Sequence, residues 1–238
     1  MEKLEPLEAA KRLIAERFPD CQGALLAGSV VRGEATETSD LDIVIFDKNL
    51  PWSFRESLVE SGWPVELFAH NLTSYKQFIA MDCESGTPTM PRMIAEGIVL
   101  KDEGILDSLK KESQTIVDRG PEEWSGEFIR TKRYFLTDAL DDFLGSKSRA
   151  EDLFIANSLA ELVQEFVLRT NCHWIGTSKW VVRELKRFDE SFAEEFINAF
   201  DTFYVSGEKG KVVQLVDKVL APYGGRLFDG FSIGKEEL

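Results

Sequence analysis

Two aspartates, Asp40 and Asp42, stand at the start of an apolar run that ends at Phe46. Successive side chains of a β-strand point to opposite faces, so both carboxylates are expected on one face, together with Val44 and Phe46, while Leu41 faces the other way. Like charges this close repel unless a cation lies between them or one acid keeps its proton. Magnesium accepts one or two carboxylates together with substrate phosphates. The pair therefore indicates a magnesium site, although a polar turn followed by an exposed edge residue gives the same Asp-x-Asp pattern.

A glycine-serine pair precedes this strand. Gly28 and Ser29 end a short apolar run, residues 24–27, which we expect to be a buried strand. Glycine permits a tight turn, and a brief helical turn expected over residues 30–33 would present a hydroxyl and free backbone N–H groups to phosphate oxygens. Arg32 in the same loop is a candidate phosphate contact, with a solvated arginine as the alternative. The stretch thus predicts a phosphate site beside a metal site.

The elements that must position these residues belong to a small α/β region in the first hundred residues. Helical spacing predicts a helix over residues 7–18, ended by Pro19. Apolar runs predict strands over residues 24–27, 41–46 and 65–69, and residues 52–61 are interpreted as a helix.

Helical periodicity dominates the rest of the chain. Short helices are expected over residues 93–97 and 105–117. The pattern then predicts a bundle of about five helices, over residues 128–144, 153–170, 178–188, 190–204 and 211–223. We expect the two regions to join near residues 103–122.

Composition narrows the function class. The net charge of −14 argues against a nucleic-acid partner and suits a cationic one, although the same charge also serves solubility. Three cysteines without metal-ligand or CxxC spacing are interpreted as buried free thiols, and two histidines make a zinc site unexpected. No apolar run is long enough to cross a bilayer, and the charged, amphipathic beginning of the chain does not resemble a signal peptide, so we expect a cytoplasmic protein with no membrane partner.

The run GSVVRGEATETSDLDIVIF, residues 28–46, resembles the signature of the DNA polymerase β-like nucleotidyltransferases, especially the minimal and the antibiotic nucleotidyltransferases. That signature is Gly-Ser, a short run that often contains arginine and glycine, and then Ser-Asp-x-Asp followed by apolar residues. The resemblance implies that Asp40 and Asp42 hold catalytic magnesium and that Gly28 and Ser29 bind the triphosphate.

The family also uses a third acid from a later strand. Glu66 in WPVELFAH fits this position, because strand alternation places it on one face with Phe68. We expect Glu66 to complete the metal site or to take the proton from the attacking hydroxyl; an exposed edge glutamate is the alternative.

The resemblance implies an α+β architecture: a small mixed-sheet catalytic domain, assigned to residues 1–105, followed by an all-α helical-bundle domain, residues 106–238. The resemblance is carried by sequence motifs over residues 24–46, extends to residues 62–70, and after residue 122 is one of architecture alone. No motif of the second half maps onto known substrate-binding residues. Weaker candidates there are Lys179, after an expected helix start at Thr177–Ser178, and the basic cluster Lys132–Arg133–Tyr134. The acids Asp138, Asp141 and Asp142 could line a pocket for an amine or form a solvated helix face.

The leading functional prediction is a magnesium-dependent adenylyltransferase that moves AMP from ATP to a hydroxyl of a small molecule such as an aminoglycoside. The catalytic and metal residues are Asp40, Asp42 and Glu66, and nucleotide contacts are assigned to Gly28, Ser29, Arg32 and Lys179. Two other hypotheses stay open: a minimal nucleotidyltransferase that adenylylates a protein, and a non-catalytic nucleotide-binding module. Both a monomer and a homodimer are compatible with the sequence.

Overall fold

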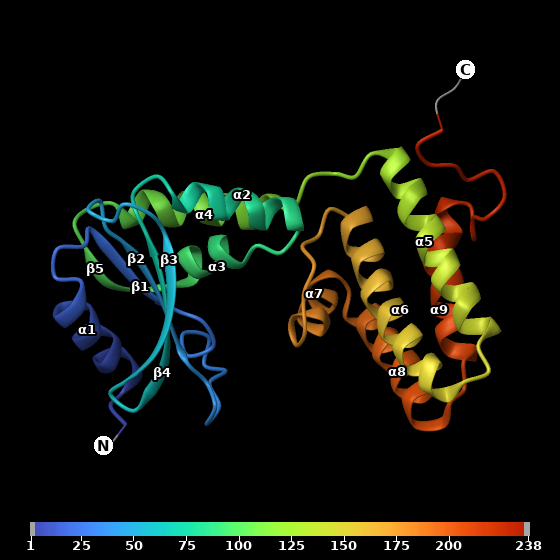
Figure 1. Ribbon diagram of the computed structural model, residues 1–238, viewed down its shortest axis with the longest axis horizontal. Helices are drawn as coiled ribbons and strands as arrows, with labels where there is room; N and C mark the ends of the chain where they lie inside the picture. Colours follow the sequence, from blue (N-terminus) through green and yellow to red (C-terminus); the bar gives the residue numbers. More distant parts are fainter. Residues whose placement is uncertain (1–2, 236–238) are drawn as a thin grey trace. The chain divides into compact units, whose positions relative to one another are not determined.

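The computed structural model describes residues 3–235. The chain forms two compact units, Met1–Gly120 and Pro121–Leu238 (Figure 1). The division falls at Gly120 rather than after residue 105. Helix α4, Leu106–Arg119, follows the last strand and packs on the first unit, where Leu106 and Leu109 are buried in its core.

A five-stranded mixed sheet forms the centre of the first unit, in the order β3-β4-β2-β1-β5. Strands β2 and β4 are parallel, and the other neighbouring pairs are antiparallel. The mixed sheet and the helical second unit confirm the α+β class. The strands are β1 Gly23–Ala27, β2 Leu41–Phe46, β3 Phe54–Glu60, β4 Trp63–His70 and β5 Ile98–Asp102.

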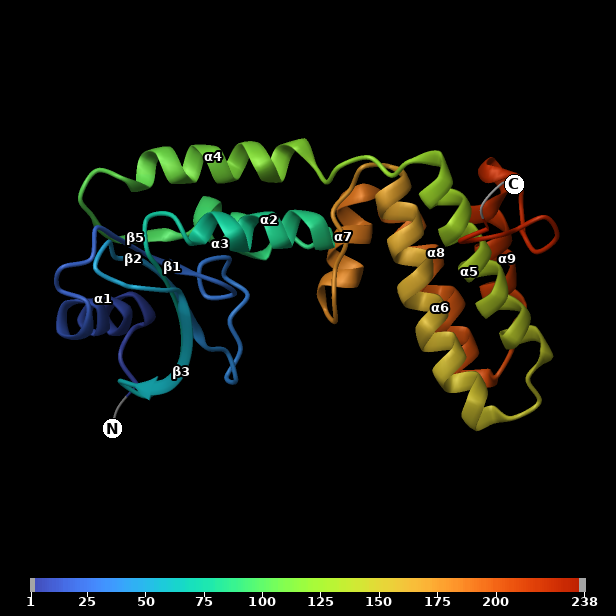
Figure 2. The ribbon, with the colours of Figure 1, turned by 45° about the horizontal axis from the view of Figure 1, so that its top comes forward.

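Helices cover both faces of this sheet (Figure 2). Helix α1, Pro6–Arg17, packs on one face, where its buried residues meet Leu41, Ile43 and Ile45 of β2. Helices α2, Tyr75–Ser85, and α3, Thr89–Glu96, lie with α4 on the other face, against Val44 and Phe46. The alternation predicted for β2 is therefore confirmed, and Asp42 belongs to the face that carries α2, α3 and α4.

The helix predicted over residues 52–61 is wrong. The segment FRESLVE is β3, and its burial alternates with a period of two, which a helix would not give. The reason lies partly in the turn that follows: Ser61 and Gly62 both have positive φ, 49° and 81°, as a two-residue hairpin turn requires. This turn folds β3 back on β4, so the edge strand gains its hydrogen bonds from a neighbour in sequence. Strand β5 and helix α2 were not predicted either.

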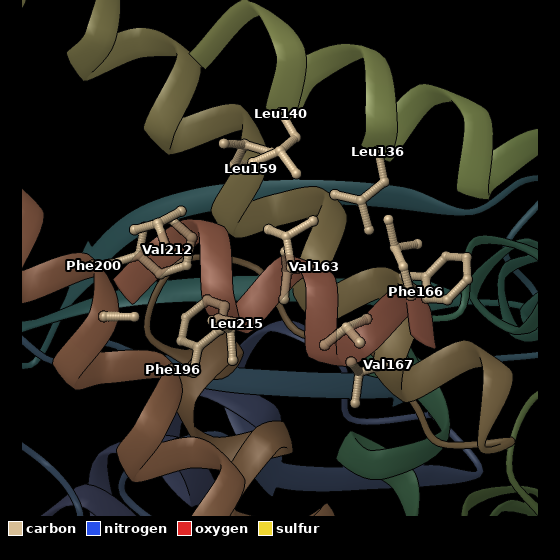
Figure 3. Packing of buried hydrophobic residues seen from close by; sticks show 14 of the residues in the cluster. Leu136, Leu140, Leu159, Val163, Phe166, Val167, Phe196, Phe200, Val212 and Leu215 are labelled. Atoms are coloured by element: carbon tan, nitrogen blue, oxygen red, sulfur yellow. The ribbon is translucent and has the colours of Figure 1, made fainter. Parts of the chain in front are cut away.

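The second unit is a bundle of the five expected helices within the described residues. Three of them begin at a side-chain cap: Ser125 accepts a hydrogen bond from Phe128 N, Ser148 from Glu151 N and Asp189 from Phe192 N. Their apolar faces meet in a core of residues such as Leu140, Val163 and Leu215 (Figure 3). The helices are α5 Gly126–Gly145, α6 Arg149–Thr170, α7 Trp180–Phe188, α8 Glu190–Ser206 and α9 Gly210–Leu220.

The cysteines differ from the prediction. Cys21 is a buried free thiol, but Cys83 is half-buried and Cys172 is exposed, because they lie on a partly covered helix face and in the turn after α6. Over residues 3–235, no helix is long and apolar enough to span a bilayer.

Candidate active site

The three predicted acids lie together at one end of the sheet. Asp40 immediately precedes β2, Asp42 is the second residue of β2, and Glu66 lies in β4. Asp42 is the direct partner of Glu66 in the parallel ladder, so their side chains leave the same face side by side. One ligand oxygen from each of the three carboxylates lies within 4.8 Å of the others, and all three residues are half-buried.

Gly28, in the turn directly after the neighbouring strand β1, lies against this cluster. Its backbone has φ +80°, and a Cβ built on it would lie 1.9 Å from Oδ2 of Asp42. A side chain fits there only if the Asp42 carboxylate or the turn shifts, because Ala27 pairs with Asp42 in the β1–β2 ladder and the following turn passes directly against the carboxylate. The glycine is thus required by close approach as well as by its φ.

The loop after Gly28 is held by its own hydrogen bonds. Ser29 is buried, and its hydroxyl donates to Oγ of Ser39 at 3.2 Å, while Oγ of Ser39 accepts from the N–H of Thr36 at 2.8 Å. The N–H of Glu34 donates to the carbonyl of Ser29 at 2.9 Å. Residues 29–33 form a hydrogen-bonded turn and no α-helix, so the phosphate site expected at a helix N-terminus is reduced to a turn with a buried hydroxyl.

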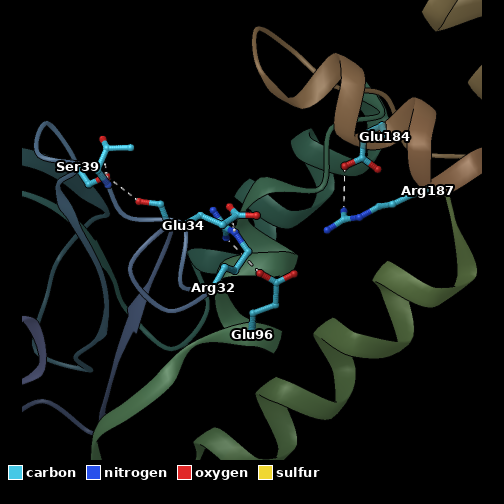
Figure 4. Close-up of polar contacts among 8 residues, drawn as sticks. Arg32, Glu34, Ser39, Glu96, Glu184 and Arg187 are labelled. Carbon is cyan, nitrogen blue, oxygen red and sulfur yellow. Dashed lines mark hydrogen bonds and ion pairs between the residues drawn. The ribbon is translucent and has the colours of Figure 1, made fainter. Parts of the chain in front are cut away.

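Arg32 extends from this loop to the end of α3 (Figure 4). Its Nε donates to Glu34 at 3.1 Å and its Nη1 to Glu96 at 3.2 Å. Both carboxylates belong to the first unit.

Arg55 is a functional candidate that the sequence reasoning missed. Its Nη2 contacts Oε2 of Glu66, and its guanidinium lies over the ring of Phe68 with the carbon 4.9 Å from the ring centroid. Because residues 52–61 were interpreted as a helix, nothing placed Arg55 beside β4. The alternation of FRESLVE was the signal that could have found it.

The electrostatics of the cluster are those of crowded like charges. The pKa of Asp42 is raised to about 6, first by burial and then by the negative charges of Asp40 and Glu66, while the positive charges of Arg32 and Arg55 lower it. A cation among these carboxylates would relieve both the desolvation and the repulsion.

The donor set fits a hard divalent cation. All three side chains offer carboxylate oxygens, the ligands that magnesium prefers. Because Gly28 has no Cβ, the Asp42 carboxylate has room to lie within the cluster. Among the described residues, this is the group of acids that meets the spacing of a metal site.

Comparison with known proteins supports this interpretation. Residues 7–67, which contain the glycine turn and all three acids, match the family model of the nucleotidyltransferase domain. The matched residues lie within the first unit. The predicted resemblance to the polymerase β-like nucleotidyltransferases is thereby confirmed.

A solved structure of a nucleotidyltransferase-like protein from Exiguobacterium sibiricum is similar over 92% of this chain and 75% of its own, with 12% sequence identity and a TM-score of 0.47. No curated protein matches the sequence.

The weaker candidates of the sequence lie in the second unit. Lys179 is the exposed residue before α7, which begins at Trp180, two residues later than predicted. Its contact with nucleotide stays a prediction. Lys132 is paired with Glu165 at 2.7 Å, and Arg133 donates to three carbonyls of residues 224–226, so both have structural partners within the bundle.

The acids of α5 have different surroundings. Asp141 and Asp142 line a hollow of about 520 Å³ together with Glu151 and Phe154, whereas Asp138 is an exposed residue of the same helix. Asp141 also pairs with Nη1 of Arg226 at 3.7 Å.

Proposed function

We propose that the protein transfers a nucleoside monophosphate, AMP from ATP, to a hydroxyl group of a small molecule and releases pyrophosphate. The observation that carries the proposal is the convergence of three carboxylates within 4.8 Å, directly against the Gly28 turn of a nucleotidyltransferase domain. A module that only binds nucleotide would not require three crowded acids, which destabilise the fold unless a cation joins them.

The proposed roles follow from the positions of the side chains. Asp40 and Asp42 hold the divalent metal ion, magnesium, and the ladder pairing of Asp42 with Glu66 supports a ligand role for Glu66 as well. When bound, the ion supplies positive charge that neutralises the triphosphate during in-line attack on the α-phosphorus.

Ser29 is assigned to the β- and γ-phosphates. Its hydroxyl lies in the turn beside the carboxylates and donates to Ser39, so a bound phosphate oxygen would replace Ser39 as the acceptor of that proton. Arg32 adds positive charge to the same loop, although Glu34 and Glu96 hold its guanidinium in the structure.

The acceptor is proposed to be cationic, as an aminoglycoside is. A net charge of −14 attracts amines over long range. Within the helical unit, the hollow lined by Asp141, Asp142 and Glu151 has an exposed aromatic ring, Phe154, at its wall, and carboxylates combined with an aromatic face suit an ammonium group.

The test is transfer of label from α-³²P-ATP in the presence of magnesium. The acceptors are a panel of aminoglycosides and lincosamides in one arm and a protein extract in the other. We expect a labelled small molecule; a labelled protein would replace the proposed acceptor class by a protein, and no labelled product in either arm would contradict the proposal.

The variant Asp42→Asn tests the site within the same assay. It removes one charged ligand with little change in size, so we expect turnover to fall by at least about a thousandfold while the fold persists. Asp20→Asn is the matched control, because Asp20 is an exposed aspartate of the same unit outside the acidic cluster. Similar activity of the two variants would refute the metal assignment.

A further inference from the structure

We infer that Arg55 sets the metal affinity of the acidic cluster by competing with the divalent ion for Glu66. This inference rests on the proposed function, since it takes Asp40, Asp42 and Glu66 as the metal ligands. It goes beyond that function because it assigns a positioning role to a residue of the edge strand β3.

The sheet places Arg55 beside Glu66 by register. Strand β3 runs antiparallel to β4, with Arg55 opposite Phe68 and Ser57 opposite Glu66. Arg55 is thus the diagonal neighbour of Glu66 on the same face, a separation that a long side chain spans easily.

Two contacts hold the arginine over the acid. The guanidinium lies on the face of Phe68, and its Nη2 donates to Oε2 of Glu66. The side chain of Arg55 is 60% exposed and that of Glu66 25% exposed, so the arginine covers the acid from the solvent side. The contact with Phe68 keeps the positive charge near the cluster even when Glu66 turns to another partner.

Arginine and a metal ion make incompatible demands on Glu66. A guanidinium has only donors, so it cannot share in coordination, and its charge repels a divalent cation close by. Arg32, the other arginine whose charge reaches Asp42, donates to Glu34 and Glu96. A divalent ion that takes Oε2 of Glu66 must therefore displace Arg55 from it.

The size of the effect follows from the exposure of the pair. Partly exposed ion pairs of this kind have coupling energies that correspond to an equilibrium change of about 1.5- to 5-fold. Removal of Arg55 also removes its repulsion of the ion, which acts in the same direction. We expect Arg55→Gln to bind the divalent ion about two- to fivefold more tightly than the wild-type protein.

The experiment is a titration of the full chain, treated with EDTA and dialysed, with Mn²⁺, whose free concentration is followed by electron paramagnetic resonance. Arg17→Gln is the matched control. Arg17 pairs with Glu56 of the same strand at 2.9 Å, and Glu56 lies on the opposite face from Arg55, so this variant loses the same charge and a similar exposed ion pair away from the cluster.

We expect Arg55→Gln to bind Mn²⁺ more tightly than Arg17→Gln does. Arg55→Lys should lie closer to the wild-type protein, because it keeps the positive charge. Equal or weaker binding in Arg55→Gln than in Arg17→Gln overturns the inference while the metal site stands. The proposed function fails, and the inference with it, if the wild-type protein binds no Mn²⁺ or if Asp42→Asn leaves its Mn²⁺ binding unchanged.

Discussion

The close approach of Gly28 to Asp42 gives the sharpest single test of the site. Gly28→Ala introduces a Cβ that would lie 1.9 Å from Oδ2 of Asp42, whereas ordinary contact begins at 3.4 Å. The carboxylate must therefore withdraw by about 1.5 Å, or the turn must shift by a similar amount. Either movement breaks the arrangement of the three acids.

Gly33→Ala isolates the effect of the clash. Gly33 has φ +70°, close to that of Gly28, but a Cβ there meets nothing within 4 Å. Both variants place alanine in the left-handed region, which costs about 1–2 kcal/mol. Urea unfolding should show this loss for both, while only Gly28→Ala also disturbs the carboxylates.

We expect Gly28→Ala to lose activity because the Asp42 carboxylate is displaced from its position. A displacement of about 1 Å at a catalytic group can cost about 100-fold in rate, so we expect at least that loss for Gly28→Ala, measured as pyrophosphate release from ATP with magnesium. A Mn²⁺ titration of the same variant should show weakened binding, which separates damage to the metal site from damage to the acceptor site. If both glycine variants keep equal activity and equal Mn²⁺ affinity, the reasoning about the cluster is refuted.

The other predictions concern stability. Burial lowers the pKa of His70 to about 4, so below about pH 6.5 the unfolded chain takes up a proton that the folded one does not, and stability falls as the pH drops toward 4. Relative to His70→Phe, the wild-type protein should lose about 3 kcal/mol of unfolding free energy between about pH 7 and pH 4 in urea titrations; parallel pH profiles of the two proteins would contradict this. Phe203→Ala, at a fully buried ring that packs on Phe143, should cost about 3–5 kcal/mol, followed by circular dichroism. The adjacent Tyr204→Ala, at a half-exposed ring, should cost clearly less, and equal losses would contradict the packing argument.

Several features of the candidate site were readable from the sequence because they depend on local rules. Strand alternation put Asp42 on the face of Val44 and Phe46, and put Glu66 on the face of Phe68, and the structure has both arrangements. The glycine of the turn was expected from its conformational freedom. The helices of the second unit followed from spacing alone, since an amphipathic helix carries its period in its own residues.

Other features had no local signal. The segment that became β3 is short and half exposed, and its choice between helix and strand was made by pairing with β4 through the Ser61–Gly62 turn. Arg55 therefore reached Glu66 through the register of two strands. Glu96, which pairs with Arg32, lies 64 residues further along the chain. It is the last residue of α3, a helix on the face of the sheet that carries Asp42.

Sequence by itself thus determined the kinds of groups in the site and the faces on which they stand, because residue type and the twofold period of a strand are local properties. Only the tertiary structure decided which groups meet. The parallel pairing of β2 with β4 brings Asp42 to Glu66, and the edge position of β3 sets Arg55 beside them. These meetings depend on hydrogen-bond register and shared burial between distant segments, which no short stretch of chain contains.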